Sequence, residues 1–147
     1  MSPPTFLDGF ILGIFATLLG TLANHLLAKD RDMRREFNDT ANIFRNIFER
    51  IIATIHQNPG LTVCQIAEDI LMKNYPDQSI AMGSLNRQMW CWRRCAFRKA
   101  WQKYIDPEDC GNEPFLSYCG MPYEEGKSFD RQYILGAIEH LISFSNK

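Results

Sequence analysis

The sequence predicts an all-α protein that consists of an N-terminal transmembrane helix followed by a small bundle of about four helices. Three observations support this fold class. Residues 10–28 contain no formally charged side chain. Apolar residues in the rest of the chain recur at spacings of three and four, which is the period of an amphipathic helix. No run of alternating polar and apolar residues indicates a β-strand.

The composition is that of a folded chain with almost no overall charge. Its 147 residues allow one domain with one appended element. Apolar residues make up 46% and charged residues 22%, which excludes a disordered chain, and the mean hydropathy of −0.25 excludes several membrane spans. Sixteen Lys and Arg against seventeen Asp and Glu produce a net charge of −1, so no overall positive field indicates nucleic-acid binding.

The uncharged stretch over residues 10–28 has the length of a membrane span. As a helix, its nineteen residues extend about 28 Å, close to the ~30 Å hydrocarbon core of a bilayer. A cleaved secretory signal is the alternative, but the stretch lacks the positively charged segment that precedes the apolar region of a signal peptide. We therefore expect a single-pass protein with membrane lipid around this helix.

The flanks of the stretch predict its orientation. Residues 1–9 contain no Lys or Arg, whereas four basic residues follow the stretch closely: Lys29, Arg31, Arg34 and Arg35. Short basic flanks stay on the cytoplasmic side of a membrane. Residues 1–9 are thus predicted to be a short extracytoplasmic tail, and residues 29–147 a cytoplasmic helical domain.

One face of the stretch carries small residues. Gly9 and Gly13 form a GxxxG pattern, and Gly20 and Asn24 follow on nearly the same face. Small residues allow two helices to approach closely within lipid, and Asn24 can form a hydrogen bond across the contact. The pattern predicts a homo-oligomer through this face, although glycine is also common in spans that do not self-associate.

Helix-breaking and helix-capping residues divide the rest of the chain. An apolar stripe that starts at Met33 predicts a helix that ends at the turn over residues 58–60. Thr62 and Gln65 form a capping-box pattern, which predicts a second helix that stops before Pro76. The expected elements beyond it are a third helix over residues 81–105, a loop over residues 106–128 and a last helix capped by Ser128 or Asp130.

The predicted helix over residues 81–105 is basic and rich in aromatic residues. It contains six basic residues and no acidic one. Three interpretations remain open: neutralisation by acidic residues of the following loop, binding of anionic lipid head groups, and binding of nucleic acid. The near-zero net charge favours internal neutralisation. The candidate residues for an anionic partner are Arg87, Arg94 and Arg98, whereas Trp92 is expected in the core.

The cysteines and titratable residues form no catalytic pattern, so we expect no enzymatic activity, no cofactor and no metal. Cys91, Cys95, Cys110 and Cys119 have the spacing Cys-x3-Cys…Cys-x8-Cys, which differs from that of zinc knuckles. An odd total of five cysteines is typical of free thiols in a reducing compartment rather than of a disulfide framework. No nucleophile elbow, phosphate-binding loop or carboxylate pair is present.

Two short segments resemble a known group of proteins. Residues 34–45 contain the pattern EF-x3-A-x2-FR, and residues 97–104 read FRKAWQKY, similar to F-x2-AW-x2-Y. In both segments the chain resembles uncharacterised bacterial membrane-anchored proteins with one N-terminal span and a soluble helical domain. The resemblance implies this architecture and a bacterial origin, which together with the basic flank predicts a location in the bacterial inner membrane.

One functional expectation follows from the apolar stretch, the amphipathic helices and the missing catalytic pattern. The sequence predicts a membrane-anchored helical module that binds an unidentified protein or a second copy of itself. The alternative is a peripheral protein that binds anionic lipid head groups or nucleic acid through residues 81–105, with nucleic acid the less favoured of the two.

Overall fold

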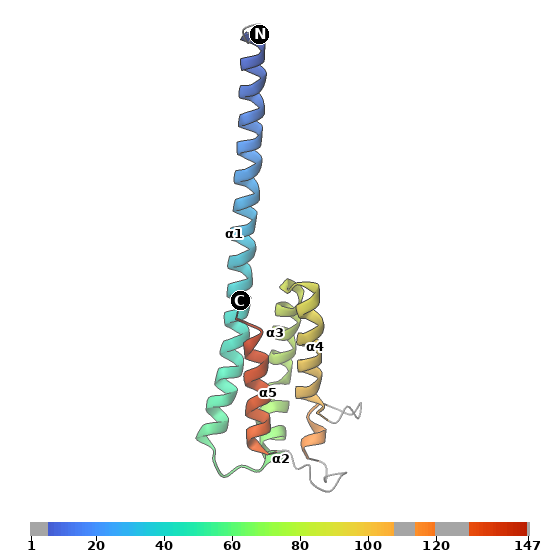
Figure 1. Ribbon diagram of the computed structural model, residues 1–147. Helices are drawn as coiled ribbons and strands as arrows, with labels where there is room; N and C mark the ends of the chain where they lie inside the picture. The colour runs from blue at the N-terminus through green and yellow to red at the C-terminus, as the bar shows by residue number, and fades with distance from the viewer. Residues whose placement is uncertain (1–5, 108–113, 120–129, 147) are drawn as a thin grey trace. The chain divides into compact units, whose positions relative to one another are not determined.

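The structure, a computed structural model, describes residues 6–107, 114–119 and 130–146 (Figure 1). Within these ranges every regular element is a helix, which confirms the all-α part of the predicted fold class. The elements in chain order are α1 (Phe6–Gln57), α2 (Val63–Gln65), the π-helix η1 (Ile66–Met72), α3 (Tyr75–Gln88), α4 (Cys91–Ile105), the 3-10 helix η2 (Leu116–Tyr118) and α5 (Arg131–Ser143). The chain divides into two compact units, Met1–Glu36 and Phe37–Lys147.

The predicted transmembrane helix over residues 10–28 is wrong. These residues are helical as part of α1, but among the described residues no helix is both long and apolar enough to cross a membrane. The absence of charged side chains was therefore an insufficient criterion. Six of the nineteen residues are glycine or polar and interrupt the apolar run: Gly13, Thr17, Gly20, Thr21, Asn24 and His25.

An aromatic core stabilises the second unit. Phe44 and Phe48, on the C-terminal part of α1, are fully buried against α4. The ring of Phe44 lies 5.6 Å from that of Phe97, and the ring of Phe48 lies 5.8 Å from that of Tyr104, both edge to face. Such pairs contribute about 0.5–1.5 kcal/mol each beyond the burial of their area. The predicted helical bundle is confirmed for this unit, in which Figure 1 shows α3, α4 and α5 side by side.

Two predicted helix starts are found in the structure. The Thr62 hydroxyl accepts a hydrogen bond from the backbone N–H of Gln65 at 3.3 Å, and the Gln65 side chain accepts one from the backbone N–H of Thr62 at 2.9 Å. Asp130 caps α5, since its carboxylate accepts from the backbone N–H of Tyr133 at 2.7 Å. Ser128, the alternative cap, lies outside the described residues.

The single helix predicted over residues 81–105 is wrong, because the chain leaves the helix at Met89 and Trp90. Both residues have an extended backbone, with ψ of 152° and 148°. The break makes α3 and α4 antiparallel in Figure 1 and turns Trp92 away from the core, where Trp101 is buried instead. Apolar periodicity did not reveal this break, since no proline or glycine marks it.

Candidate functional site

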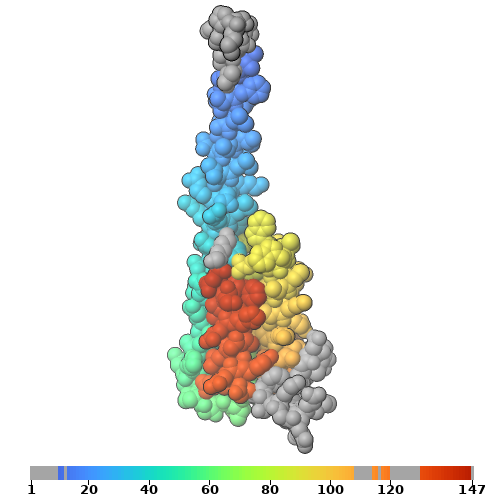
Figure 2. Space-filling view, in the orientation of Figure 1, coloured from blue at the N-terminus to red at the C-terminus, as the bar shows by residue number. Residues whose placement is uncertain are grey.

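The first candidate surface is a run of exposed apolar side chains on α1. Between residues 10 and 27, called here the apolar segment, nine large apolar residues are 46% to 65% exposed: Phe10, Ile11, Ile14, Phe15, Leu18, Leu19, Leu22, Leu26 and Leu27. In Figure 2 this stretch of α1 is coloured blue. Monomeric proteins in water rarely leave a continuous apolar surface of this extent uncovered, so the segment indicates an interaction site.

Small residues form one face of the apolar segment. Gly13, Thr17, Gly20 and Asn24 follow one another at spacings of four, three and four, so they share one side of the helix. A Cβ atom added at Gly13 or Gly20 would meet nothing within 4 Å among the described residues. Glycine inside a helix costs about 0.8–1.0 kcal/mol relative to alanine, and packing against the described residues does not explain this cost. The surroundings of Gly9 lie outside what the structure describes.

The polar side chains of the apolar segment differ in their need for a partner. The Thr17 hydroxyl donates to the carbonyl of Gly13 at 2.9 Å, and the Thr21 hydroxyl donates to the carbonyls of Thr17 and Leu18 at 3.0 and 2.9 Å. Such back-bonding satisfies a hydroxyl without water. The Asn24 amide makes no hydrogen bond within the part of the chain that the structure describes, so it is available to a partner.

The second candidate surface lies at the break between α3 and α4. Arg87 is exposed near the end of α3, and Arg98 is exposed on α4. Trp90 and Trp92, between them in the sequence, are 73% and 70% exposed. We call these four residues the tryptophan corner. Among the described residues neither Arg87 nor Arg98 has an ion pair, so the corner combines positive charge with two exposed indole rings.

Arg94, the third predicted residue for an anionic partner, has a structural contact instead. Its Nε donates to the carbonyl of Met89 at 2.7 Å, and its guanidinium also donates to the carbonyl of Arg87. Arg93 likewise donates to the carbonyls of Phe144 and Asn146, at 3.0 Å each. The last carbonyls of a helix lack partners within it, and these arginines satisfy such groups at the ends of α3 and α5.

The acidic residues expected to neutralise α4 are described only in part. Asp106 is buried and accepts a hydrogen bond from the Ser117 hydroxyl at 2.7 Å. The other acidic residues of the predicted loop lie outside the described residues: Glu108, Asp109, Glu113, Glu124 and Glu125. Internal neutralisation of the basic helix therefore stays a prediction.

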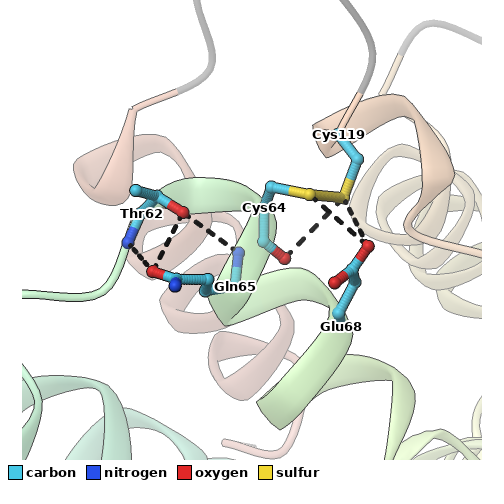
Figure 3. The surroundings of a disulfide bond; sticks show 5 residues. All are labelled: Thr62, Cys64, Gln65, Glu68 and Cys119. Atoms are coloured by element: carbon cyan, nitrogen blue, oxygen red, sulfur yellow. Dashed lines mark hydrogen bonds between the residues drawn. A yellow bond between two sulfur atoms is a disulfide. The ribbon is translucent and has the colours of Figure 1, made fainter.

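The third candidate site contains two cysteines and a glutamate (Figure 3). Cys64 on α2 and Cys119 after η2 form a disulfide, with their Cα atoms 4.5 Å apart. The prediction of free thiols is wrong for this pair and holds for Cys91 and Cys95, which are free and exposed. Sequence reasoning missed the pair because its two members are 55 residues apart and no local pattern joins them. Cys110 lies outside the described residues.

Comparison with known proteins identifies no relative. No model of a protein family matches the chain, and no curated protein or solved structure matches it either. The resemblance to bacterial membrane-anchored proteins accordingly stays a prediction.

Proposed function

We propose that the chain is a helical self-association module in which the apolar segment of α1 pairs with the same segment of a second copy. One observation carries the proposal: nine large apolar side chains of this segment are exposed. Pairing along one face of the helix removes from water those of these side chains that flank the contact, which contributes roughly 25 cal/mol for each Å² buried. The proposal keeps the expected interaction function and does not include a membrane span.

The small-residue face supports a second copy as the partner. Spacings of four and three repeat along Gly13, Thr17, Gly20 and Asn24, as they do along the contact line of a two-helix coiled coil. Glycines at this line let two backbones approach closely, and a symmetric dimer places each glycine against an equally small face. An asparagine at such a line fixes the register of the two helices, because its amide pairs with the amide of the other copy.

The hydroxyl groups support a dry contact at the same face. A polar group that enters an apolar contact without a hydrogen bond costs about 1–3 kcal/mol. Thr17 and Thr21 avoid this cost, since each hydroxyl already donates to a backbone carbonyl of α1. Only Asn24 on this face then needs a partner, and the second copy supplies it.

Sedimentation equilibrium of the full chain in a mild nonionic detergent tests the proposal. Gly13→Leu and Gly20→Leu place a large side chain where the two helices approach. Leu22→Ala is the matched control, because residue 22 lies on the opposite face of the helix and the change removes apolar surface. We expect a dimer whose dissociation constant rises at least about tenfold, or about 1.4 kcal/mol, in each glycine variant and stays nearly constant in Leu22→Ala.

Non-specific association predicts the opposite order of the variants. Gly13→Leu and Gly20→Leu increase the apolar surface and would then strengthen association, while Leu22→Ala would weaken it. That order, or a monomer at every concentration of the wild-type chain, contradicts the proposal. Uptake of the monomer into lipid vesicles without self-association also contradicts it.

A second candidate function is binding of anionic lipid head groups by the tryptophan corner. The observation that favours it is the exposure of Trp90 and Trp92 in a segment that also exposes Arg87 and Arg98. Tryptophan is enriched at the boundary between membrane and water, and each basic residue near an anionic surface contributes about 1 kcal/mol. Nucleic acid is less favoured, since the net charge of the chain is −1.

Flotation with vesicles tests this second candidate. We expect binding to phosphatidylserine vesicles and not to phosphatidylcholine vesicles, with a blue shift of tryptophan fluorescence. The double variant Arg87→Glu/Arg98→Glu is expected to lose binding, whereas Arg50→Glu, at an exposed position on α1, is the matched control and keeps it. Equal binding by both variants contradicts the candidate, as does equal binding to both lipids.

A further inference from the structure

Cys64, Glu68 and Cys119 bring three possible metal ligands together in the second unit. We propose that the two thiolates and the Glu68 carboxylate bind a Zn²⁺ ion in the reduced protein. The three donor atoms lie within 4.8 Å of one another and come from two separate segments of the second unit. Thiolates are soft ligands that select zinc over magnesium or calcium.

The distances around Glu68 fit a tetrahedral site. Its Oε1 atom lies 3.6 Å from the Sγ atom of Cys64 and 3.9 Å from that of Cys119 (Figure 3). Zinc binds sulfur at about 2.3 Å and carboxylate oxygen at about 2.1 Å, so tetrahedral angles separate these ligands by roughly 3.6 Å. The carboxylate therefore already stands at the ligand spacing from both sulfurs. The distance between the two sulfurs is thus the one that has to increase for metal binding, and rotation of the two cysteine side chains can provide this increase.

Two of the three ligands come from consecutive elements, Cys64 from α2 and Glu68 from η1, which follows it directly. Cys64 and Glu68 are four residues apart, one helical turn, and the capping box of Thr62 and Gln65 fixes the start of that turn. Cys119 faces them, with its Sγ 3.7 Å from the carbonyl oxygen of Cys64. Both cysteines are half-buried, whereas Glu68 is exposed and leaves the fourth position of the metal open to water.

In the disulfide form the exposed Glu68 carboxylate lies beside two sulfur atoms that give it no hydrogen bond. A disulfide sulfur has no proton, so it donates no hydrogen bond to the carboxylate beside it. Among the described residues no Lys or Arg forms an ion pair with Glu68. A divalent cation between the three groups makes the same arrangement favourable, because it attracts the carboxylate and both thiolates.

The disulfide and the metal site are alternative states of the same atoms. Reduction by a dithiol breaks the S–S bond, protonates both sulfurs and converts the dithiol into its own disulfide. Binding of Zn²⁺ then displaces one proton from each of the two thiols, so two protons are released for each ion bound. The oxidised protein has no thiolate to offer and is expected to bind no zinc at this site.

Metal titration of the full-length chain tests the proposal. We expect the protein reduced with a phosphine to bind one Zn²⁺ and to release two protons, and the oxidised protein to bind none. Cobalt in place of zinc should produce a thiolate-to-metal charge-transfer absorption. Cys64→Ser is expected to lower the affinity at least about 100-fold and Glu68→Gln about tenfold. The double variant Cys91→Ser/Cys95→Ser is the matched control and should bind as the wild type does.

A second readout does not depend on the folding of any variant. Bound zinc should protect Cys64 and Cys119 of the reduced wild-type chain from alkylation, while Cys91 and Cys95 react as they do without zinc. Mass spectrometry of the peptides measures both pairs in one sample. The proposal is overturned if zinc protects neither Cys64 nor Cys119, if the oxidised protein binds zinc equally well, or if Cys91→Ser/Cys95→Ser abolishes binding.

Discussion

The hydroxyl of Tyr104 donates a hydrogen bond of 2.9 Å to Oε1 of Gln78, and both side chains are fully buried. The amide of Gln78 in turn donates to the carbonyl of Leu71 at 3.0 Å. These two buried hydrogen bonds join α4 to α3 and to the end of η1 inside the core of the second unit. Buried polar groups stabilise a fold only while all their partners are present, so this contact is a sensitive point of the second unit.

Tyr104→Phe is expected to lower the free energy of unfolding by about 1–3 kcal/mol, because it leaves Oε1 of Gln78 buried without this donor. Urea unfolding followed by circular dichroism measures the change. The double variant Tyr104→Phe/Gln78→Met removes both groups and should recover part of the loss. An additive loss in the double variant would show that the hydrogen bond is not the cause.

Alkaline pH is expected to destabilise the second unit. Burial and the neighbouring Tyr118 raise the pKa of Tyr104 well above the usual 10.0, and burial also raises the pKa of Tyr118. Above about pH 10 the unfolded chain loses these phenolic protons while the folded chain retains them, so the free energy of unfolding falls as the pH rises. Urea midpoints between about pH 8 and pH 11 measure this fall. A smaller fall in Tyr104→Phe checks the assignment, and an unchanged one contradicts it.

Reduction of the Cys64–Cys119 disulfide in metal-free buffer is expected to destabilise the fold. Opening a loop closed across 55 residues costs up to about 4 kcal/mol in the chain-entropy account. Thermal unfolding with and without a phosphine reductant, in the presence of a chelator, measures the difference. Cys91→Ser/Cys95→Ser, which alters only exposed free thiols, should leave it unchanged. No difference between the oxidised and reduced chains would contradict this expectation.

The aromatic core is expected to tolerate truncation poorly. Phe48→Ala removes a fully buried ring that lies against Trp101 and Tyr104, and such changes cost about 3–5 kcal/mol. Ile43→Ala on the same helix is the matched control, because Ile43 is 60% exposed and its truncation should cost under about 0.5 kcal/mol. Similar losses in the two variants, measured by urea unfolding, would be evidence against this packing.

Local signals predicted the parts of the fold that depend on neighbouring residues. The capping box at Thr62 and the cap at Asp130 were correct, because each involves residues only three positions apart. The break at Met89 and Trp90 was missed because contacts between α3 and α4, rather than a helix-breaking residue, accompany it. Because the break was missed, Trp92 was predicted to lie in the core, although the structure exposes it.

Long-range and solvent-dependent features were less accessible to sequence reasoning. The approach of Cys64 to Cys119 depends on the fold of the residues between them, so no spacing rule indicated it. The transmembrane helix was predicted from missing charges, whereas no helix among the described residues is long and apolar enough to cross a membrane. The small-residue face at Gly13, Gly20 and Asn24 was identified, and its role in self-association stays a proposal.

Cysteine cross-linking tests the pairing of two apolar segments most directly. A chain with Cys91, Cys95 and Cys110 replaced by serine keeps only the disulfide-bonded pair, and one new cysteine is added on either face of the helix. We expect mild oxidation to convert Thr17→Cys, on the small-residue face, into covalent dimers and to leave Leu22→Cys, on the opposite face, mostly monomeric. Equal cross-linking at both positions, or stronger cross-linking of Leu22→Cys, would contradict pairing through the small-residue face.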